Sequence, residues 1–141
     1  MSEIKFSIDI LNDELEKDLV VDPSKLQFEA SNNPILYGKW IRYKALVKAE
    51  IMKLDVDRKK LMKQKLDYYT CRDENEICMT IYEKSELKTV YSADKELLSV
   101  DTKLEYFGIL YELTKDAIEL FKNRGFAIKN MIDIRMLESG K

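Results

Sequence analysis

Residues 35–69 are the stretch that most restricts the fold, because they contain no proline and a single glycine near the start. Their apolar side chains recur every three or four residues and share one face of a helical wheel. These are Leu36, Trp40, Tyr43, Val47, Ile51, Leu54, Leu61 and Tyr69. At 1.5 Å per residue, the pattern predicts a helix roughly 50 Å long. Such a helix has to bury its apolar stripe against another long helix or a second subunit.

The basic residues of this helix divide between two faces. Lys60 and Lys63 lie opposite the apolar stripe, together with Arg42 and Lys53. Arg58 and Lys65 fall within the angular range of the stripe instead. Two interpretations stay open at this point. The stripe ends near Leu54 and the aliphatic stem of Arg58 reaches along the helix end, or both charges face a group that attracts them.

The N-terminal third of the chain predicts short helices. Residues 3–19 have the spacing of an amphipathic helix or a frayed arm, and Asp22-Pro23 ends it. Ser24 is placed to cap a second short helix. The run 31–34, Ser-Asn-Asn-Pro, then either breaks the pattern or kinks one continuous helix.

The middle of the chain is less regular. Residues 70–80 form a polar, acidic turn that contains Cys71 and Cys78. The sequence allows either two free thiols or one disulfide between these two cysteines. Residues 81–102 have helical spacing, with a small β-hairpin around 85–100 as the alternative.

Residues 103–123 predict a strong helix with a wide apolar surface, and Asn123-Arg124-Gly125 suggests a cap or kink at its end. Because one helix hairpin cannot easily cover this much apolar surface, we infer an oligomer interface, with an intramolecular bundle core as the alternative. The candidate assembly residues are Phe107, Leu110, Leu113, Ala117, Ile118, Leu120, Phe121, Phe126, Ile128 and Met131.

The predicted fold is mainly α, a long helix hairpin with short N-terminal helices. We expect residues 1–102 to carry the binding function and residues 103–141 to carry assembly. With only 4 Gly and 2 Pro, the chain has too few turn residues for a many-turned β-sandwich or barrel.

Several classes of function are disfavoured. The chain has no His, which is the commonest general base and metal ligand. Its two Cys lack the spacing of a zinc site, and its four isolated Gly residues form no phosphate-binding loop. We therefore expect no enzyme, metal or cofactor. No apolar run reaches the ~20 residues that a membrane span requires, and no secretory signal is evident, so we expect a cytoplasmic protein.

The net charge of −2 hides a strong segregation. Residues 36–66 hold 10 basic and 3 acidic residues, whereas residues 67–106 hold 5 basic and 10 acidic ones. A concentrated basic segment favours a polyanionic partner, although a solvated helix face is the alternative. Cations beside an aromatic ring suit single-stranded nucleic acid, because they contact phosphates while the ring stacks on bases. The candidate binding residues are Arg58, Lys59, Lys60, Lys63, Lys65 and Tyr68, whereas Tyr69 is expected to pack inside.

Several long blocks of the sequence resemble the UvsY family of recombination mediators from T-even-type phages. These blocks are KLQFEASNN at 25–33, LYGKW at 36–40, KLDYY at 65–69, YEKSELKTVYSADKELLSVDT at 82–102 and RGFAIKNMIDIRMLESGK at 124–141. The resemblance implies a protein that binds single-stranded DNA in the cytoplasm of an infected bacterium. It also implies loading of the phage recombinase UvsX onto strands coated by the phage single-strand-binding protein.

The resemblance further implies a homo-oligomeric ring or barrel of six or seven subunits, assembled through the C-terminal part. The family's basic-x-basic motif before LDYY falls on Lys63 and Lys65. The family pattern has Arg at the second place, so Lys65 keeps the charge but loses the planar, bidentate guanidinium. The competing hypothesis is a non-catalytic helical adaptor or chaperone that binds protein partners.

Overall fold

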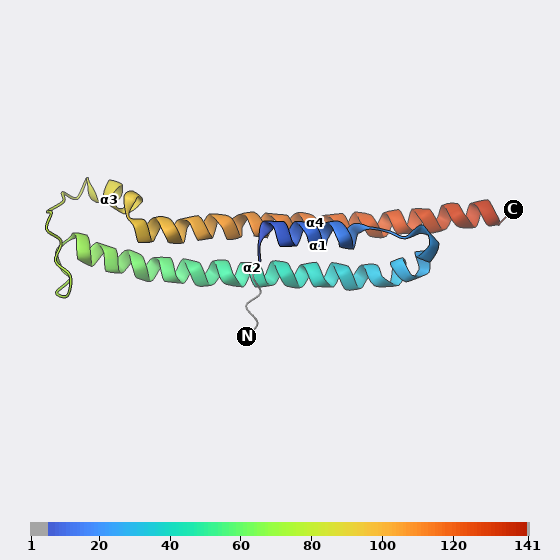
Figure 1. Cartoon of the computed structure of the whole chain (residues 1–141), viewed down its shortest axis with the longest axis horizontal. Coiled ribbons are helices and arrows are strands. Elements are labelled where there is room, and N and C mark those ends of the chain that lie inside the picture. The colour runs from blue at the N-terminus through green and yellow to red at the C-terminus, as the bar shows by residue number, and fades with distance from the viewer. Residues whose placement is uncertain (1–5, 141) are drawn as a thin grey trace. The chain divides into compact units, whose positions relative to one another are not determined.

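The computed structural model describes residues 6–140, and it is mainly α-helical, as predicted. Its elements are helix α1 (Ile8–Leu19), a short 3-10 helix η1 (Pro23–Lys25), α2 (Leu26–Tyr69), α3 (Leu87–Ala93) and α4 (Lys95–Ser139) (Figure 1). Residues 3–5 of the first expected helix lie outside the described part of the chain. Cys71 and Cys78 are both free thiols, and the polar turn between α2 and α3 contains them.

Local capping explains where the first elements begin. The Ser7 hydroxyl accepts a hydrogen bond from the Ile10 backbone N–H at 3.1 Å and caps α1. The Asp22 carboxylate accepts from the Ser24 backbone N–H at 2.9 Å and caps η1, with Pro23 at the first position. The predicted cap at Ser24 is therefore supplied by Asp22 instead.

Pro34 does not interrupt α2, which runs through it as one continuous helix. Of the two alternatives for residues 31–34, the structure thus takes the continuous helix rather than the break. A proline here removes one backbone hydrogen bond.

The alternative of a β-hairpin around 85–100 is wrong, because this segment is helical. The Asp94 carboxylate explains the start of α4: its Oδ1 atom accepts from the backbone N–H groups of Glu96 at 3.0 Å and Leu97 at 3.1 Å. These bonds satisfy donors that have no partner within the helix. Residues Ala93 to Lys95, which suggested a hairpin turn, instead form the junction between α3 and α4.

The helix end suggested at residues 123–125 is also absent, since α4 continues to Ser139. Gly125 serves close packing rather than a cap, and its backbone has no positive φ. A Cβ atom at this position would lie 3.0 Å from the Asn33 side-chain nitrogen. The glycine therefore allows α4 and α2 to approach each other closely here.

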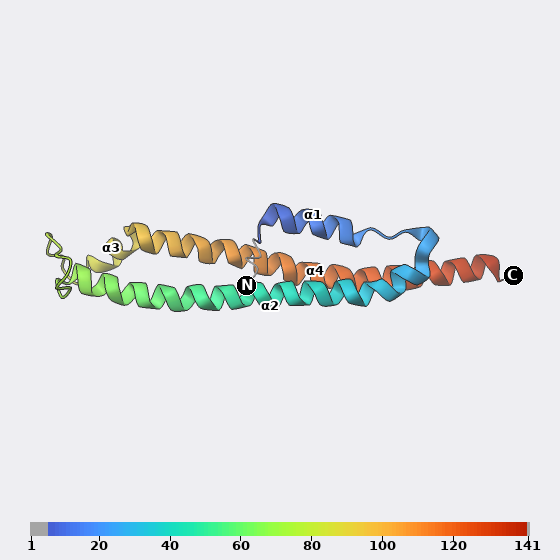
Figure 2. The ribbon, with the colours of Figure 1, turned by 60° about the horizontal axis from the view of Figure 1, so that its bottom comes forward.

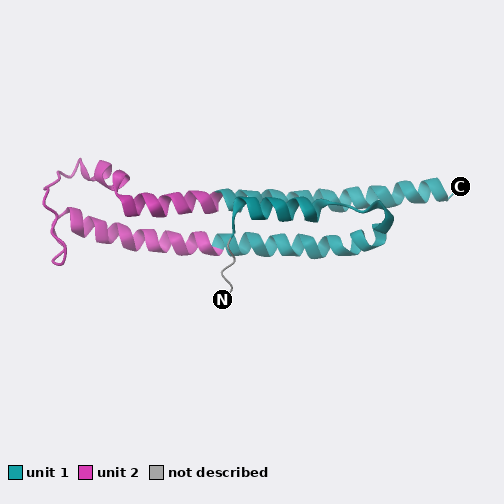
Figure 3. Ribbon diagram, viewed as in Figure 1, with its two compact units in different colours: residues 1–48, 109–141 teal, residues 49–108 magenta. Residues whose placement is uncertain are grey.

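The chain forms two compact units, coloured separately in Figure 3. Unit 1 comprises residues 1–48 and 109–141, and unit 2 comprises residues 49–108. The functional division expected at residue 102 falls inside α4 and does not follow these units.

Unit 1 has a core made by three helical segments. The indole of Trp40 is fully buried and stacks on Phe121 with ring centroids 6.1 Å apart. Its Nε1 atom donates to Asp18 at 3.0 Å, which joins α1 to α2. Figures 1 and 2 both show α1 running alongside the N-terminal half of α2. This core contains Leu11, Leu15, Val47, Leu110, Ala117 and Ile128.

A buried polar cluster completes unit 1. The Arg124 side chain is 4% exposed and donates to the carbonyl oxygens of Leu19 at 3.2 Å and Val20 at 2.8 Å. It also donates to Asn33 at 2.8 Å and lies 3.2 Å from the Glu29 carboxylate. The cluster joins three helices, because one guanidinium on α4 contacts both α2 and the C-terminal end of α1.

Candidate nucleic-acid interface

Lys60 and Lys63 lie on the solvent-exposed face of α2 in unit 2, as the helical wheel predicted, and Lys59 at the border of that face is exposed as well. Lys59 contacts Asp55 at 3.1 Å and Lys63 contacts Asp67 at 2.8 Å, each one turn away on the same helix. Within residues 6–140, Lys60 has no carboxylate partner. These three lysines, called the outer lysine row below, present ammonium groups along one side of the helix.

The ion pairs of the outer lysine row are open to exchange. The Lys59 and Lys63 side chains are 76% and 74% exposed, and solvent-exposed pairs of this type contribute little to stability. Hydrogen bonding to Lys63 lowers the pKa of Asp67, so this carboxylate stays charged near neutral pH. A phosphate can replace these carboxylates at little cost, since the pairs are weak and hydrated.

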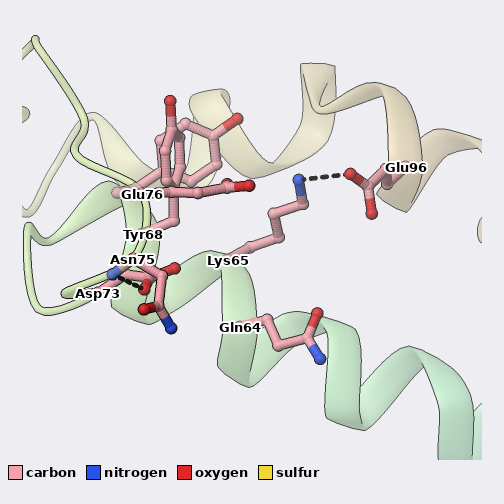
Figure 4. Close-up of a pocket in the computed structure, with 8 residues that line it drawn as sticks. Gln64, Lys65, Tyr68, Asp73, Asn75, Glu76 and Glu96 are labelled. Atoms are coloured by element: carbon pink, nitrogen blue, oxygen red, sulfur yellow. Dashed lines mark hydrogen bonds and ion pairs between the residues drawn. The ribbon is translucent and has the colours of Figure 1, made fainter.

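Lys65 faces a different environment from Lys63. Its side chain is 17% exposed, and its Nζ atom lies 3.3 Å from Asp94. The same atom lies 3.2 Å from Glu96, a contact drawn in Figure 4. Burial would lower the Lys65 pKa, but the hydrogen bonds to Glu96 and Asp94 outweigh it and raise the pKa. The two positions of the basic-x-basic motif are therefore not equivalent, because only Lys63 is free to reach a ligand without breaking contacts to another element.

Arg58, like Lys65, contacts a carboxylate outside α2. Its Nε atom donates to Asp101 on α4 at 2.5 Å, and this bond raises the pKa of the guanidinium. Both cations that fell within the apolar stripe thus face carboxylates. Of the two interpretations of the helical wheel, the one in which these charges face an attracting group is correct. Asp94, Glu96 and Asp101 were missed by sequence reasoning, since their pairing partners lie some 30 to 40 residues away.

The two tyrosines at the end of α2 have different roles. Tyr69 packs inside, as expected, and its hydroxyl donates to Asp94 at 2.6 Å. This hydrogen bond and burial raise the Tyr69 pKa. Tyr68 meets Tyr69 edge to face, with ring centroids 4.9 Å apart, and is half-buried. Part of Tyr68 therefore remains accessible.

A cavity of about 540 Å³ adjoins Tyr68 and is shown in Figure 4. Its wall contains Lys65 but also Asp73, Glu76 and Glu96. Three carboxylates against one ammonium repel phosphate, so the cavity is unsuited to the backbone of a nucleic acid. The electrostatics favour the outer lysine row as the path for a strand, with Tyr68 at the border between the two.

The ten candidate assembly residues do not share one environment. Leu110, Ala117, Phe121 and Ile128 are buried within unit 1. Phe107, Leu113, Ile118 and Met131 are half-buried, whereas Leu120 and Phe126 are exposed by 41% and 59%. The first four side chains are occupied inside the subunit, so an interface between copies would have to use the remaining six.

Other kinds of site find no support in residues 6–140. No group of three or more Cys, Asp or Glu side chains in this range is arranged to hold a metal ion. None of the described helices is both long and apolar enough to cross a membrane.

Comparison with known proteins identifies the family. The family model "Recombination, repair and ssDNA binding protein UvsY" matches residues 14–141. The recombination protein uvsY of Enterobacteria phage T4 is 48% identical over 132 residues, which covers 93% of this chain and 96% of that protein.

The fold agrees as well. Two crystal structures of the bacteriophage T4 recombination mediator protein UvsY superpose with TM-scores of 0.86 and 0.87, at 44% and 42% identity. The matches cover 95% and 94% of this chain and 98% and 99% of the two crystallised chains. The chain therefore belongs to the UvsY family of recombination, repair and single-stranded-DNA-binding proteins.

Proposed function

We propose that this protein is a recombination mediator that binds single-stranded DNA and promotes loading of a UvsX-type recombinase. Its substrate strand would be coated by the phage single-strand-binding protein, in the cytoplasm of the infected bacterium. Family membership and the outer lysine row on α2 support this proposal together. The observation that carries it is that three neighbouring ammonium groups are exposed and at most weakly paired.

The proposed mechanism requires no chemistry on the DNA. Lys59, Lys60 and Lys63 contact phosphates and release counterions, while the accessible part of Tyr68 contacts a base. A subunit with three such cations binds weakly. A homo-oligomer of six or seven copies presents the row repeatedly to one strand, and effective concentration makes the overall binding tight.

Recombinase loading then follows from a shift in populations. If the oligomer holds the strand in a conformation that the recombinase binds better than the single-strand-binding protein does, it favours exchange between them. The mediator needs only a differential affinity for the two states of the strand. Recombination, repair and recombination-dependent replication would all depend on this step.

Titration of a fluorescent oligonucleotide at two salt concentrations tests DNA binding. We expect tight binding at low salt and a steep loss of affinity as salt rises. Recombinase filament assembly on strands precoated with single-strand-binding protein tests the mediator step, and we expect the protein to shorten the lag.

The adaptor hypothesis predicts a different result. An adaptor would bind recombinase or single-strand-binding protein directly, yet it would show no affinity for the oligonucleotide at either salt concentration. Normal DNA binding without any effect on filament assembly would instead reject the mediator step alone.

A further inference from the structure

Lys44 and Lys48 of α2 converge on one aromatic ring of α4 in unit 1. Their Nζ atoms lie 5.5 Å and 5.4 Å from the centroid of the Tyr111 ring. Both distances are within the range of cation–π attraction. Lys48 is exposed, whereas Lys44 and Tyr111 are half-buried, so the cluster reaches the surface. We call these three residues the lysine–tyrosine cluster.

The lysine–tyrosine cluster is not neutralised by acidic side chains. Among residues 6–140, neither lysine has a carboxylate oxygen within 4.0 Å. The sequence explains this, because no Asp or Glu stands three or four residues from either lysine along α2. The same holds for Tyr111 along α4. Two ammonium groups therefore share a small area with no counter-charge from their own helix faces.

This arrangement differs from that of the outer lysine row. Lys59 and Lys63 each have an aspartate one helical turn away, which partly cancels their charge. Two like charges one turn apart are unfavourable without a partner. The ring of Tyr111 offsets part of this repulsion through its negative face, but a quadrupole does not neutralise a charge. The two unneutralised ammonium groups therefore favour an anionic ligand.

We propose that the lysine–tyrosine cluster is a second contact for phosphodiester groups of single-stranded nucleic acid. Lys44 and Lys48 are one turn apart, roughly 6 Å along the helix axis, so they can contact successive phosphates of one strand. Contact with Tyr111 restricts both lysine side chains before binding, which reduces the entropy lost when a phosphate is bound. This inference rests on the proposed binding of single-stranded DNA.

The test compares two double variants of the full chain. Lys44→Gln with Lys48→Gln removes both charges of the cluster. Lys84→Gln with Lys88→Gln is the matched control, because these lysines are also four residues apart, are exposed, and lie in the acidic part of the chain. Each protein is titrated with a fluorescent oligo-dT across a range of salt concentrations.

We expect the Lys44/Lys48 variant to bind about tenfold more weakly at low salt, with the slope of log K against log salt reduced by roughly 1.4, since each phosphate contact contributes about 0.7. The control variant should keep the affinity and slope of the unmodified protein. If the unmodified protein binds and the Lys44/Lys48 variant has the same slope, the inference is wrong. If the unmodified protein does not bind at all, the proposed function itself fails.

Tyr111 provides a second, independent measurement. Tyr111→Phe keeps the ring and should retain the full salt slope, whereas Tyr111→Leu removes the cation–π contact and should weaken binding several-fold. Trp40 fluorescence reports whether each variant remains folded. Equal binding by the Leu and Phe variants would overturn the role assigned to the ring.

Inorganic phosphate at constant ionic strength distinguishes a strand from a small anion. We expect millimolar phosphate to leave oligonucleotide binding unchanged, because a strand gains from several linked contacts. Displacement of the oligonucleotide from the unmodified protein but not from the Lys44/Lys48 variant would show a free-phosphate site instead.

Discussion

The Nζ atom of Lys65 lies 3.3 Å from the Oδ2 atom of Asp94, whose side chain is only 5% exposed. The same Oδ2 atom accepts the hydroxyl hydrogen of Tyr69 at 2.6 Å. The second residue of the basic-x-basic motif is thus part of the internal structure of unit 2. Lys63, two positions earlier, projects outward and is 74% exposed.

This difference predicts that two lysine variants separate binding from stability. Lys65→Ala should lower the free energy of unfolding by about 1–3 kcal/mol, because it leaves the buried Asp94 without its ammonium partner. Lys63→Ala should change it by less than about 0.5 kcal/mol, yet weaken oligonucleotide binding and reduce its salt slope. Chemical denaturation and anisotropy titration measure the two effects. Equal stability of the two variants would contradict the internal role of Lys65.

Asp94 predicts a pH-dependent stability. Burial would raise its pKa, but Tyr69, the Leu97 N–H and Lys65 outweigh burial and lower the pKa below the ordinary value of 3.8. A lowered pKa contributes stability that is present above about pH 4 and is lost as the pH falls through the folded-state value. Asp94→Asn should therefore cost about 1–2 kcal/mol at pH 7, and the difference from the unmodified protein should shrink below pH 4.

Asp94→Ala serves as the comparison, since it also removes the cap of α4. It should cost about 2–4 kcal/mol at pH 7, roughly 1 kcal/mol of which comes from the lost cap and persists in acid. Urea denaturation at about pH 7 and about pH 3.5 measures both effects. A constant gap between the Asp94→Asn variant and the unmodified protein at these two pH values would show that the Asp94 charge is not stabilising.

Arg124 predicts a strong coupling within unit 1. Arg124→Leu leaves Glu29, which is 8% exposed, as a buried charge without its guanidinium partner. We expect a loss of about 3–5 kcal/mol in the free energy of unfolding. Replacing both residues by Leu should cost less than the sum of the single changes. Additive losses would mean that the two side chains do not interact.

Leu120 and Phe126 test the assembly proposal without removing α4. Truncation near residue 103 would delete Leu110, Ala117 and Phe121 from the core of unit 1, so loss of assembly by such a chain would also reflect unfolding. Leu120→Ser with Phe126→Ser changes only exposed apolar side chains. We expect folded protein that sediments as smaller species and binds DNA more weakly.

Met79→Ser is the control for this pair, because Met79 is 91% exposed and lies in the turn before α3. Its sedimentation should equal that of the unmodified protein. An unchanged oligomer in the Leu120/Phe126 variant would place the interface elsewhere.

Periodicity was sufficient to predict much of this fold. Of the eight predicted stripe residues, Trp40 and Val47 are buried and the other six are half-buried, whereas Lys60 and Lys63 on the opposite face are exposed. This division follows from the 3.6-residue repeat. The junctions were harder to predict. Residues 93–95 have the composition of a hairpin turn, yet Asp94 caps a helix because its carboxylate meets the N–H groups of residues 96 and 97.

The candidate site was predictable in composition but not in detail. The charge pattern identified the basic segment, because local composition alone determines it. It did not show that Arg58 and Lys65 contact Asp101, Asp94 and Glu96, because that depends on the register between α2 and α4. The lysine–tyrosine cluster likewise joins residues more than sixty positions apart.

The stacking of Trp40 on Phe121 has a consequence for synthesis on the ribosome. These two side chains are separated by 81 positions. At about 5–20 residues per second, Phe121 is therefore synthesised roughly 4 to 16 s after Trp40. Unit 2 is continuous in sequence and has all its residues available earlier. Unit 2 can therefore begin to pack before unit 1, and the Trp40 indole gains its stacking partner only after Phe121 has been synthesised.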